Sequence, residues 1–308
     1  MANKNLIRNV LRQYQLFLMI LPAVIWLFVF QFYPLWGWYM AFVEYKLGKT
    51  FFEHRFVGFH YFIELFKDFR FHNAFKNTLI MSVLNLTICN FFMPIFFALI
   101  LNEVKLIRFK KFVQSVSYLP HFVSWVVVSG IVIQSLSPSV GIINEVLVKI
   151  GVLRDPINFL GFEKYFYGII TISTLWKTMG WSSIIYIAAI TAVDQELYES
   201  AVVDGATRLQ KIFHITLPSI TPTIIIIFII SISGLAGGSA GYEAQLLLRN
   251  NLTYGRAEVL YLYSLTYGVN MLRFSFGTAV GIFTSVISVS LMLITNFLFR
   301  RFTEQSLF

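Results

Sequence analysis

Residue types that catalyse reactions or bind metals are sparse in this sequence. Cys89 is the one cysteine, so the chain forms neither an internal disulfide nor a cysteine-based zinc site. Gly48-Lys49-Thr50 is the nearest approach to a phosphate-binding loop, but Val43 stands where that motif requires a glycine. The long apolar segments contain no histidine pair, no paired acids and no H-E-x-x-H pattern. We therefore expect neither an ATPase site nor an enzymatic site in this chain.

A small set of polar and aromatic side chains could instead contact a polar solute. Lys177 is the only Lys, Arg, Asp or Glu within a long apolar segment, where a charge is costly unless it faces protein or water. Solute contact is one interpretation of Lys177, and structural pairing or snorkelling is the other. Further candidates, for which interfacial anchoring or core packing is the alternative, are Trp125, Trp176, Trp181, Tyr186, Tyr242 and Gln245.

The composition indicates that a lipid bilayer surrounds these residues. Of the 308 residues, 57% are hydrophobic and 13% are charged, whereas soluble domains average about 25% charged residues. The net charge of +9 could suggest nucleic-acid binding. The basic residues, however, lie beside apolar segments, as cationic membrane flanks do.

Six segments are long and apolar enough to cross the roughly 30 Å of bilayer hydrocarbon as helices. They are residues 17–42, 77–101, 112–136, 166–193, 221–240 and 279–299. We therefore expect an all-α polytopic membrane protein, with tails at 1–16 and 301–308 and a six-helix transmembrane domain at 17–300. No cleavable signal peptide is expected, because the first apolar run is too long for one.

The distribution of basic residues favours cytoplasmic termini. The tail before the first span carries three cations and no acid, and the short connection 102–111 carries four cations and one acid. The long loop 44–76 opposes this assignment with six cations. With cytoplasmic termini, residues 194–219 form the one large cytoplasmic loop.

That loop is predicted to hold two short helices. Asp194 suits an N-cap for a helix over residues 195–203, and Gly205 permits a sharp turn after it. Thr207 and Gln210 have the spacing of a capping box for a second helix. Leu217-Pro218 is expected to end that helix, because a residue before proline disfavours helical backbone. The pattern suits either an amphipathic linker on the membrane or a knob that docks into a partner.

The same loop resembles a known signature. Glu199-Ser200-Ala201 followed by Asp204-Gly205-Ala206, and then by Ile215-Thr216-Leu217-Pro218, resembles the EAA loop of ATP-binding-cassette (ABC) importer permeases. Ser200 stands where that motif has its first alanine, which is a small-for-small change. Other segments resemble the polysaccharide and multiple-sugar branch of these permeases, and the likeness covers nearly the whole chain. They are residues 56–62, 77–79, 101–104, 118–125 and 274–281.

The resemblance implies a bacterial cytoplasmic-membrane permease that moves oligosaccharides, neutral or uronate-containing, by alternating access. It implies a second permease subunit, two ATPase subunits, a solute-binding protein, and no cofactor in this chain, since ATP and Mg belong to the partner ATPase. It also implies that the EAA loop contacts the ATPase. The coupling residues carried over are Glu199, Ser200, Ala201, Asp204, Gly205, Ala206, Leu217 and Pro218. Lys177 would then be a candidate contact for an acidic sugar.

Other functions remain as alternatives. A permease of the same type could carry another solute. A secondary transporter would need coupling-ion sites in its spans, but no Asp or Glu lies in any predicted span. A receptor-type membrane protein would have no use for a docking loop.

Overall fold

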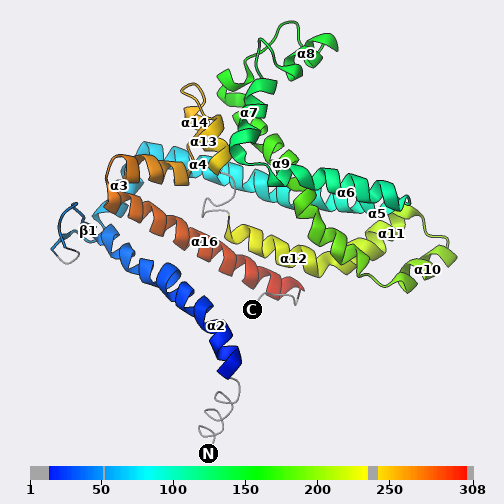
Figure 1. Ribbon diagram of the computed structural model, residues 1–308, viewed down its shortest axis with the longest axis horizontal. Helices are drawn as coiled ribbons and strands as arrows, with labels where there is room; N and C mark the ends of the chain where they lie inside the picture. The colour runs from blue at the N-terminus through cyan, green and yellow to red at the C-terminus, as the bar shows by residue number, and fades with distance from the viewer. Residues whose placement is uncertain (1–13, 51–52, 235–241, 304–308) are drawn as a thin grey trace, which may run out of the picture.

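The computed structural model describes residues 14–50, 53–234 and 242–303, and the described chain is mostly helical. Figure 1 shows several long helices that run side by side, with shorter helices gathered at their two ends. The first and last few residues of the chain lie outside the described ranges, as do residues 235–240 of the predicted fifth span. The prediction of an all-α polytopic fold is confirmed.

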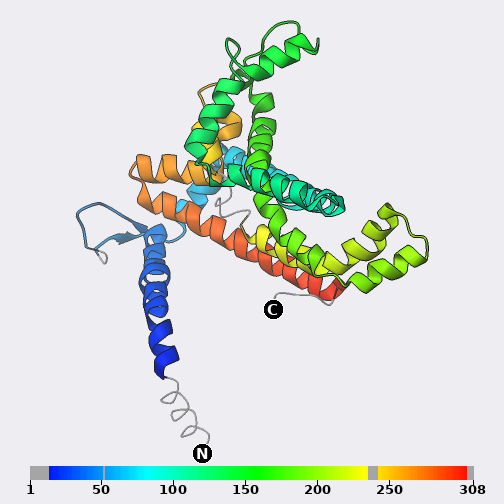
Figure 2. The same ribbon diagram turned by 45° about the vertical axis from the view of Figure 1, so that its right-hand side comes forward.

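The first span begins the described chain as α2 (Tyr14–Leu27), η1 (Phe28–Phe32) and η2 (Tyr33–Phe42). Every residue from 14 to 36 is exposed, so the first part of this span buries no side chain in this chain. It projects away from the other long helices in both views (Figures 1 and 2). Its C-terminal part, η2, packs against the last helix.

A short antiparallel hairpin links the first span to the last helix. It is formed by β1 (Val43–Glu44) and β2 (Arg55–Phe56). The Ser275 hydroxyl donates to the Val43 carbonyl oxygen at 2.7 Å and accepts from the Tyr45 N–H at 3.0 Å. This pair of hydrogen bonds joins residues 230 and 232 positions apart.

The second span is longer than the sequence predicts. Helix α3 (His60–Lys67) precedes α4 (Phe69–Leu84), η3 (Asn85–Phe92) and α5 (Met93–Glu103), and the last three form one continuous helix. The π-helical segment η3 lies directly before Pro94, which lacks the N–H that a regular helix would use. The wider turn lets the helix continue past the proline.

The third span is not a straight helix, contrary to the prediction for residues 112–136. It consists of α6 (Ile107–Phe122) and α7 (Trp125–Ser135), which meet at 101°. Pro120 occupies the last turn of α6, and the Ser124 hydroxyl caps α7 by accepting from a first-turn N–H. The break therefore follows from a proline and a serine within an apolar run. Hydropathy is high on both sides of the break, so hydropathy alone predicts one continuous segment.

The remaining long helices are α9 (Glu163–Thr191), α12 (Leu217–Ser233) and α16 (Phe274–Thr303). Four helical stretches in the described chain have the length and apolar composition for a membrane crossing, or five if the bent pair counts as one span. Helix α9 has 29 residues and is long enough. It is more polar than the others because Lys177 and several Ser and Thr interrupt it, so the predicted count of six is not confirmed.

Short elements fill the connections between the long helices. They are α8 (Ile142–Lys149), η4 (Phe159–Gly161), α10 (Gln195–Val203), α11 (Arg208–Lys211), η5 (Ile212–Thr216), α13 (Tyr242–Leu248), α14 (Tyr254–Ala257), α15 (Leu260–Tyr263) and η6 (Ser264–Asn270). Helices α10 and α11 lie at the opposite end of the bundle from α3 and α14 (Figures 1 and 2).

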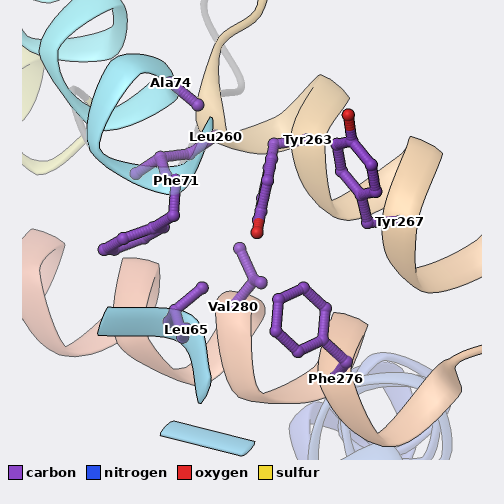
Figure 3. Packing of buried hydrophobic residues seen from close by; sticks show 8 residues of the cluster. All are labelled: Leu65, Phe71, Ala74, Leu260, Tyr263, Tyr267, Phe276 and Val280. Atoms are coloured by element: carbon purple, nitrogen blue, oxygen red, sulfur yellow. The ribbon is translucent and has the colours of Figure 1, made fainter. Parts of the chain in front are cut away.

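Three hydrophobic clusters hold the bundle together. One joins α5, α9 and α12 near the α10–α11 end through Ile95, Ala98, Tyr186, Ile190, Val193 and Ile220. A second joins α4, α9, α13 and α14. The third joins α3, α4, α15, η6 and α16, where Tyr263 lies among Phe71, Phe276 and Val280 (Figure 3). Burial of large side chains of this kind stabilises each by about 1.5–3 kcal/mol.

Candidate functional site

The predicted coupling loop forms two short helices joined by a tight turn. Helix α10 spans the predicted residues 195–203, and the Asp194 carboxylate caps it by accepting from the Glu196 N–H at 3.0 Å. The Ala206 N–H donates to the Ala201 carbonyl, and the Gly205 N–H donates to the Val202 carbonyl. These two bonds are a Schellman motif, which requires the positive φ of +78° seen at Gly205.

The second helix of the loop does not end where the sequence predicts. Thr207 and Gln210 form the predicted capping box, with the Thr207 N–H donating to the Gln210 side-chain oxygen at 2.8 Å. The helix then runs through α11, η5 and α12 without a break at Leu217-Pro218. Within η5 the Leu217 N–H donates to the Ile212 carbonyl, five residues back. This π-helical turn accommodates Pro218, so the loop is a rigid extension of the fifth span.

The two loop helices are fastened to the bundle and to each other. The Tyr198 hydroxyl on α10 lies 2.8 Å from the buried Thr216 hydroxyl, and Tyr198 also packs on the cluster of α5, α9 and α12. The Arg208 guanidinium approaches the Glu103 carboxylate at the end of α5 at 4.0 Å. A force on α10 therefore reaches three long helices through packed or bonded side chains.

The outer surface of this loop carries several large apolar side chains among its charged and polar ones. Leu197, Val202, Val203, Leu209 and Phe213 are exposed, and Val203 is 87% exposed. The resemblance assigns eight residues of this loop to ATPase coupling. Five of them are exposed, namely Glu199, Ser200, Asp204, Gly205 and Pro218, and three are half-buried, namely Ala201, Ala206 and Leu217. A single scattered apolar side chain on a surface is ordinary, but five on the two helices of this protruding loop are typical of an interaction site.

A narrow cleft of about 40 Å³ lies between the second span, the end of α12 and α13. Two predicted solute-contact residues, Tyr242 and Gln245, line it together with Asn85, Asn90 and Ser231. Gln245 is 2% exposed, and its side-chain oxygen has no hydrogen-bond partner among the described residues. A buried amide oxygen without a protein partner is suited to a hydrogen bond from a bound solute or water.

A second cavity of about 350 Å³ adjoins this cleft and shares Asn90 and Ser231 with it. Trp181 and Ser182 of α9 line it, and the Trp181 side chain is 44% exposed. No described residue that lines the cleft or the cavity is charged. Ile184, Ile185 and Ile227 complete the cavity lining, so its amide, hydroxyl and aromatic groups are set in an otherwise apolar wall.

Lys177 does not line either cavity. Its ammonium donates to the carbonyl oxygens of His121 (2.7 Å), Val123 (2.5 Å) and Pro120 (3.4 Å) at the break between α6 and α7. The side chain is buried, with 8% exposure, and the nitrogen lies 5.8 Å from the centre of the Trp125 ring. These contacts support a structural role for Lys177.

The other predicted aromatic contacts occupy different places. Trp125 begins α7 and packs against the cluster of α4, α9, α13 and α14. Tyr186 is 1% exposed in the core, and its hydroxyl donates to the Asn90 carbonyl at 3.2 Å. Trp176 lines a separate apolar groove between α7, α8 and α9. Tyr186 therefore does not line the cavity but hydrogen-bonds to the backbone of Asn90, which does.

Sequence reasoning missed Asn85, Asn90 and Ser182 as cavity residues. Asn85 and Asn90 lie inside the apolar second span, and a polar amide at that depth is a signal that could have identified them. The described residues contain no group of three or more His, Cys, Asp or Glu placed to hold a metal ion.

Comparison with known proteins identifies the family. The chain is 40% identical over 305 residues to the polygalacturonan/rhamnogalacturonan transport system permease protein YteP of Bacillus subtilis (strain 168), covering 99% of this chain and 94% of that protein. It is 34% identical over 293 residues to protein LplB of the same organism, covering 95% and 91%.

Solved structures agree. A bacterial ABC transporter involved in import of the acidic polysaccharide alginate contains a chain 40% identical to this one, with a TM-score of 0.87 and coverage of 97% of this chain and 99% of that chain. A family model matches residues 1–304. The chain therefore belongs to the inner membrane components of binding-protein-dependent transport systems, as multi-pass permease subunits of ABC importers.

Proposed function

We propose that this permease passes uronate-containing oligosaccharides through the cleft and the cavity that share Asn90 and Ser231. The observation that carries the proposal is a set of amides, hydroxyls and the Trp181 and Tyr242 rings, which stand among apolar side chains in the lining. No charged side chain lines the cleft or the cavity among the described residues. Sugar rings present hydroxyls to such amides and C–H faces to such aromatic rings. The relatives named for polygalacturonan and alginate support the uronate class.

The uncharged lining offers a uronate carboxylate hydrogen-bond donors but no cation among the described residues. A carboxylate in a dry site needs a cation or several donors. The Lys177 ammonium is bound to backbone carbonyls instead. We infer that a solute-binding protein selects the charged sugar and that this chain holds the sugar through its hydroxyls and ring faces. The alginate transporter crystallised with a periplasmic protein that carries an alginate pentasaccharide supports such a partner.

We also propose that the knob of α10 and α11 docks into an ATPase subunit that binds ATP and Mg. The exposed apolar side chains and the rigid connection to α12 support this role. Glu199, Ser200, Ala201, Asp204, Gly205 and Ala206 would form or shape the contact, and Leu217 and Pro218 would set the helix that transmits it. A second permease subunit would complete the pathway.

Both termini and the knob are proposed to face the cytoplasm. The connection between α5 and α6 carries Lys105, Arg108, Lys110 and Lys111, and α16 ends with Arg300 and Arg301. Helix α16 runs toward the end of the molecule that carries α10 and α11 (Figure 1). An excess of Lys and Arg marks the cytoplasmic side of a membrane protein.

The test is sugar-stimulated ATP hydrolysis by the reconstituted complex of both permeases, the ATPase and the binding protein. We expect an oligogalacturonate or an alginate pentasaccharide to stimulate hydrolysis and a neutral gluco-oligosaccharide of equal length to have little effect. Stimulation by the neutral sugar alone would contradict the uronate assignment. If no sugar stimulates hydrolysis, oligosaccharide import itself is contradicted.

A further inference from the structure

Three residues of α9 contact the C-terminal part of α6 and the break that follows it. Lys177, Gly180 and Trp181 have the i, i+3, i+4 spacing that places side chains on one helix face. A Cβ atom at Gly180 would overlap the carbonyl group of Ser117, so the two backbones approach as closely as glycine allows. The Trp181 indole stacks on the His121 imidazole, with ring centres 4.4 Å apart and planes 2° from parallel.

The Lys177 ammonium supplies hydrogen-bond donors to the carbonyl groups at the end of α6. The last carbonyl groups of a helix have no partner within it, and a cation near them is favourable because the helix dipole is negative there. An ammonium has three donors, and three carbonyl oxygens of the break accept from Lys177. No donor of the ammonium is left for a solute carboxylate in this structure.

The Lys177 contact also fixes an aromatic surface. One of its acceptors is the carbonyl of His121, whose ring covers one side of the Trp181 indole. The Phe122 ring meets the same indole edge-on at 5.7 Å. Trp181 in turn lines the cavity of about 350 Å³ with Asn90 and Ser182. The position of the indole in the cavity therefore depends on where Lys177 holds the end of α6.

We propose that Lys177 is a positioning residue, which holds His121 so that its imidazole backs Trp181 as a stacking surface for a sugar ring. The inference rests on the proposed function, because Trp181 is useful in this way only if a sugar passes the cavity. It differs from direct contact between Lys177 and an acidic sugar. Loss of the positioning should impair neutral and charged sugars alike.

The experiment compares Lys177→Met, His121→Ala and the double variant in the complete reconstituted complex. One readout is Trp181 emission, isolated by subtracting the spectrum of the matching variant that also carries Trp181→Phe. The other is the maximal transport rate of a uronate oligosaccharide and of any neutral oligosaccharide that the wild type transports. Lys164→Met is the charge control, since Lys164 lies on the same helix and is exposed.

We expect both single variants to shift Trp181 emission to the red and to lower the maximal rate about tenfold, the scale of one lost aromatic contact. The double variant should be no worse than the more impaired single variant, because the two residues act in series. Lys164→Met should change neither readout. His121→Ala keeps every backbone acceptor of Lys177, so it tests whether the imidazole backs Trp181 even if Lys177→Met does not assemble.

Unchanged Trp181 emission would overturn the proposal, as would additive losses in the double variant. A loss in Lys177→Met confined to uronate sugars would instead make Lys177 a direct contact. If the wild-type complex transports no sugar, the proposed function fails, while the emission spectra still decide whether Lys177 positions Trp181 through His121.

Discussion

At the scale of single residues, α6 approaches α9 at Gly180 so closely that no Cβ atom fits between them. We expect Gly180→Ala to lower the stability of the chain by about 1–3 kcal/mol, because the added methyl group must push two backbones apart. Gly168→Ala is the matched control, since the same helix leaves open space around Gly168. Thermal unfolding in detergent should show a loss for Gly180→Ala only. Equal melting temperatures for the two variants would contradict the close contact.

Glu258 is the buried acid whose protonation should be felt in stability. It is 2% exposed, and its carboxylate accepts from the Tyr254 hydroxyl at 2.6 Å. Burial raises the pKa of Glu258 above its ordinary value of 4.5. Folding therefore favours the protonated form, and the stability from this group is present below pH 4.5 and is lost as the pH rises through the raised pKa.

The prediction is that Glu258→Gln, which resembles the protonated acid, stabilises the chain more at pH 8 than at pH 5. Melting temperatures of the wild type and the variant at the two pH values measure the difference. Glu53→Gln, at an exposed acid, serves as the control. A stabilisation that is independent of pH would show that Glu258 does not titrate in this way.

At the scale of elements, the turn between α10 and α11 depends on Gly205. A non-glycine residue in left-handed backbone costs about 1–2 kcal/mol, and asparagine tolerates it better than most. We expect Gly205→Ala to reduce sugar-stimulated ATP hydrolysis by the complex and Gly205→Asn to reduce it less. Assembly of each complex is checked by co-purification of the ATPase. If alanine and asparagine behave alike, the backbone conformation of the turn is not what matters.

Local signals predicted this loop well, because they reside in neighbouring residues. Asp194, Gly205 and the Thr207–Gln210 pair each form the cap or turn that their types and spacing indicate. The helix end predicted at Leu217-Pro218 was wrong because a π-helical turn before Pro218 accommodates the proline within the helix. Nothing in the sequence marks such a turn. At Pro120 the proline was given too little weight. The break after it was missed because hydropathy is averaged over many residues and does not register a local break in the helix.

Distant contacts of the candidate site could not be predicted. The bond from Lys177 to the His121 carbonyl joins positions 56 residues apart, and only the packing of α6 on α9 brings them together. Composition showed that Lys177 is unusual, but the identity of its partners is a property of the fold. The cavity lining likewise combines the second, fourth and fifth spans.

At the scale of the whole molecule, the knob is expected to transmit force between the ATPase and the spans. Glu199 is exposed on α10, within the carried-over motif. We expect Glu199→Lys to abolish sugar-stimulated ATP hydrolysis, because reversing a charge at a docking surface replaces attraction by repulsion. Glu53→Lys, at an exposed acid far from the knob, should leave hydrolysis unchanged. Full activity of the Glu199 variant would exclude this residue from the contact.

The two hydrogen bonds of Ser275 to the β1 hairpin have a consequence for synthesis. The Val43 and Tyr45 backbone groups leave the ribosome more than 200 residues before their partner, at about 5–20 residues per second. The exposed first part of the opening span needs no other segment of this chain and can enter the bilayer at once. The hairpin end of that span must wait until translation is almost complete. Truncation before residue 275 should therefore leave an inserted chain whose first span lacks both hydrogen bonds to Ser275.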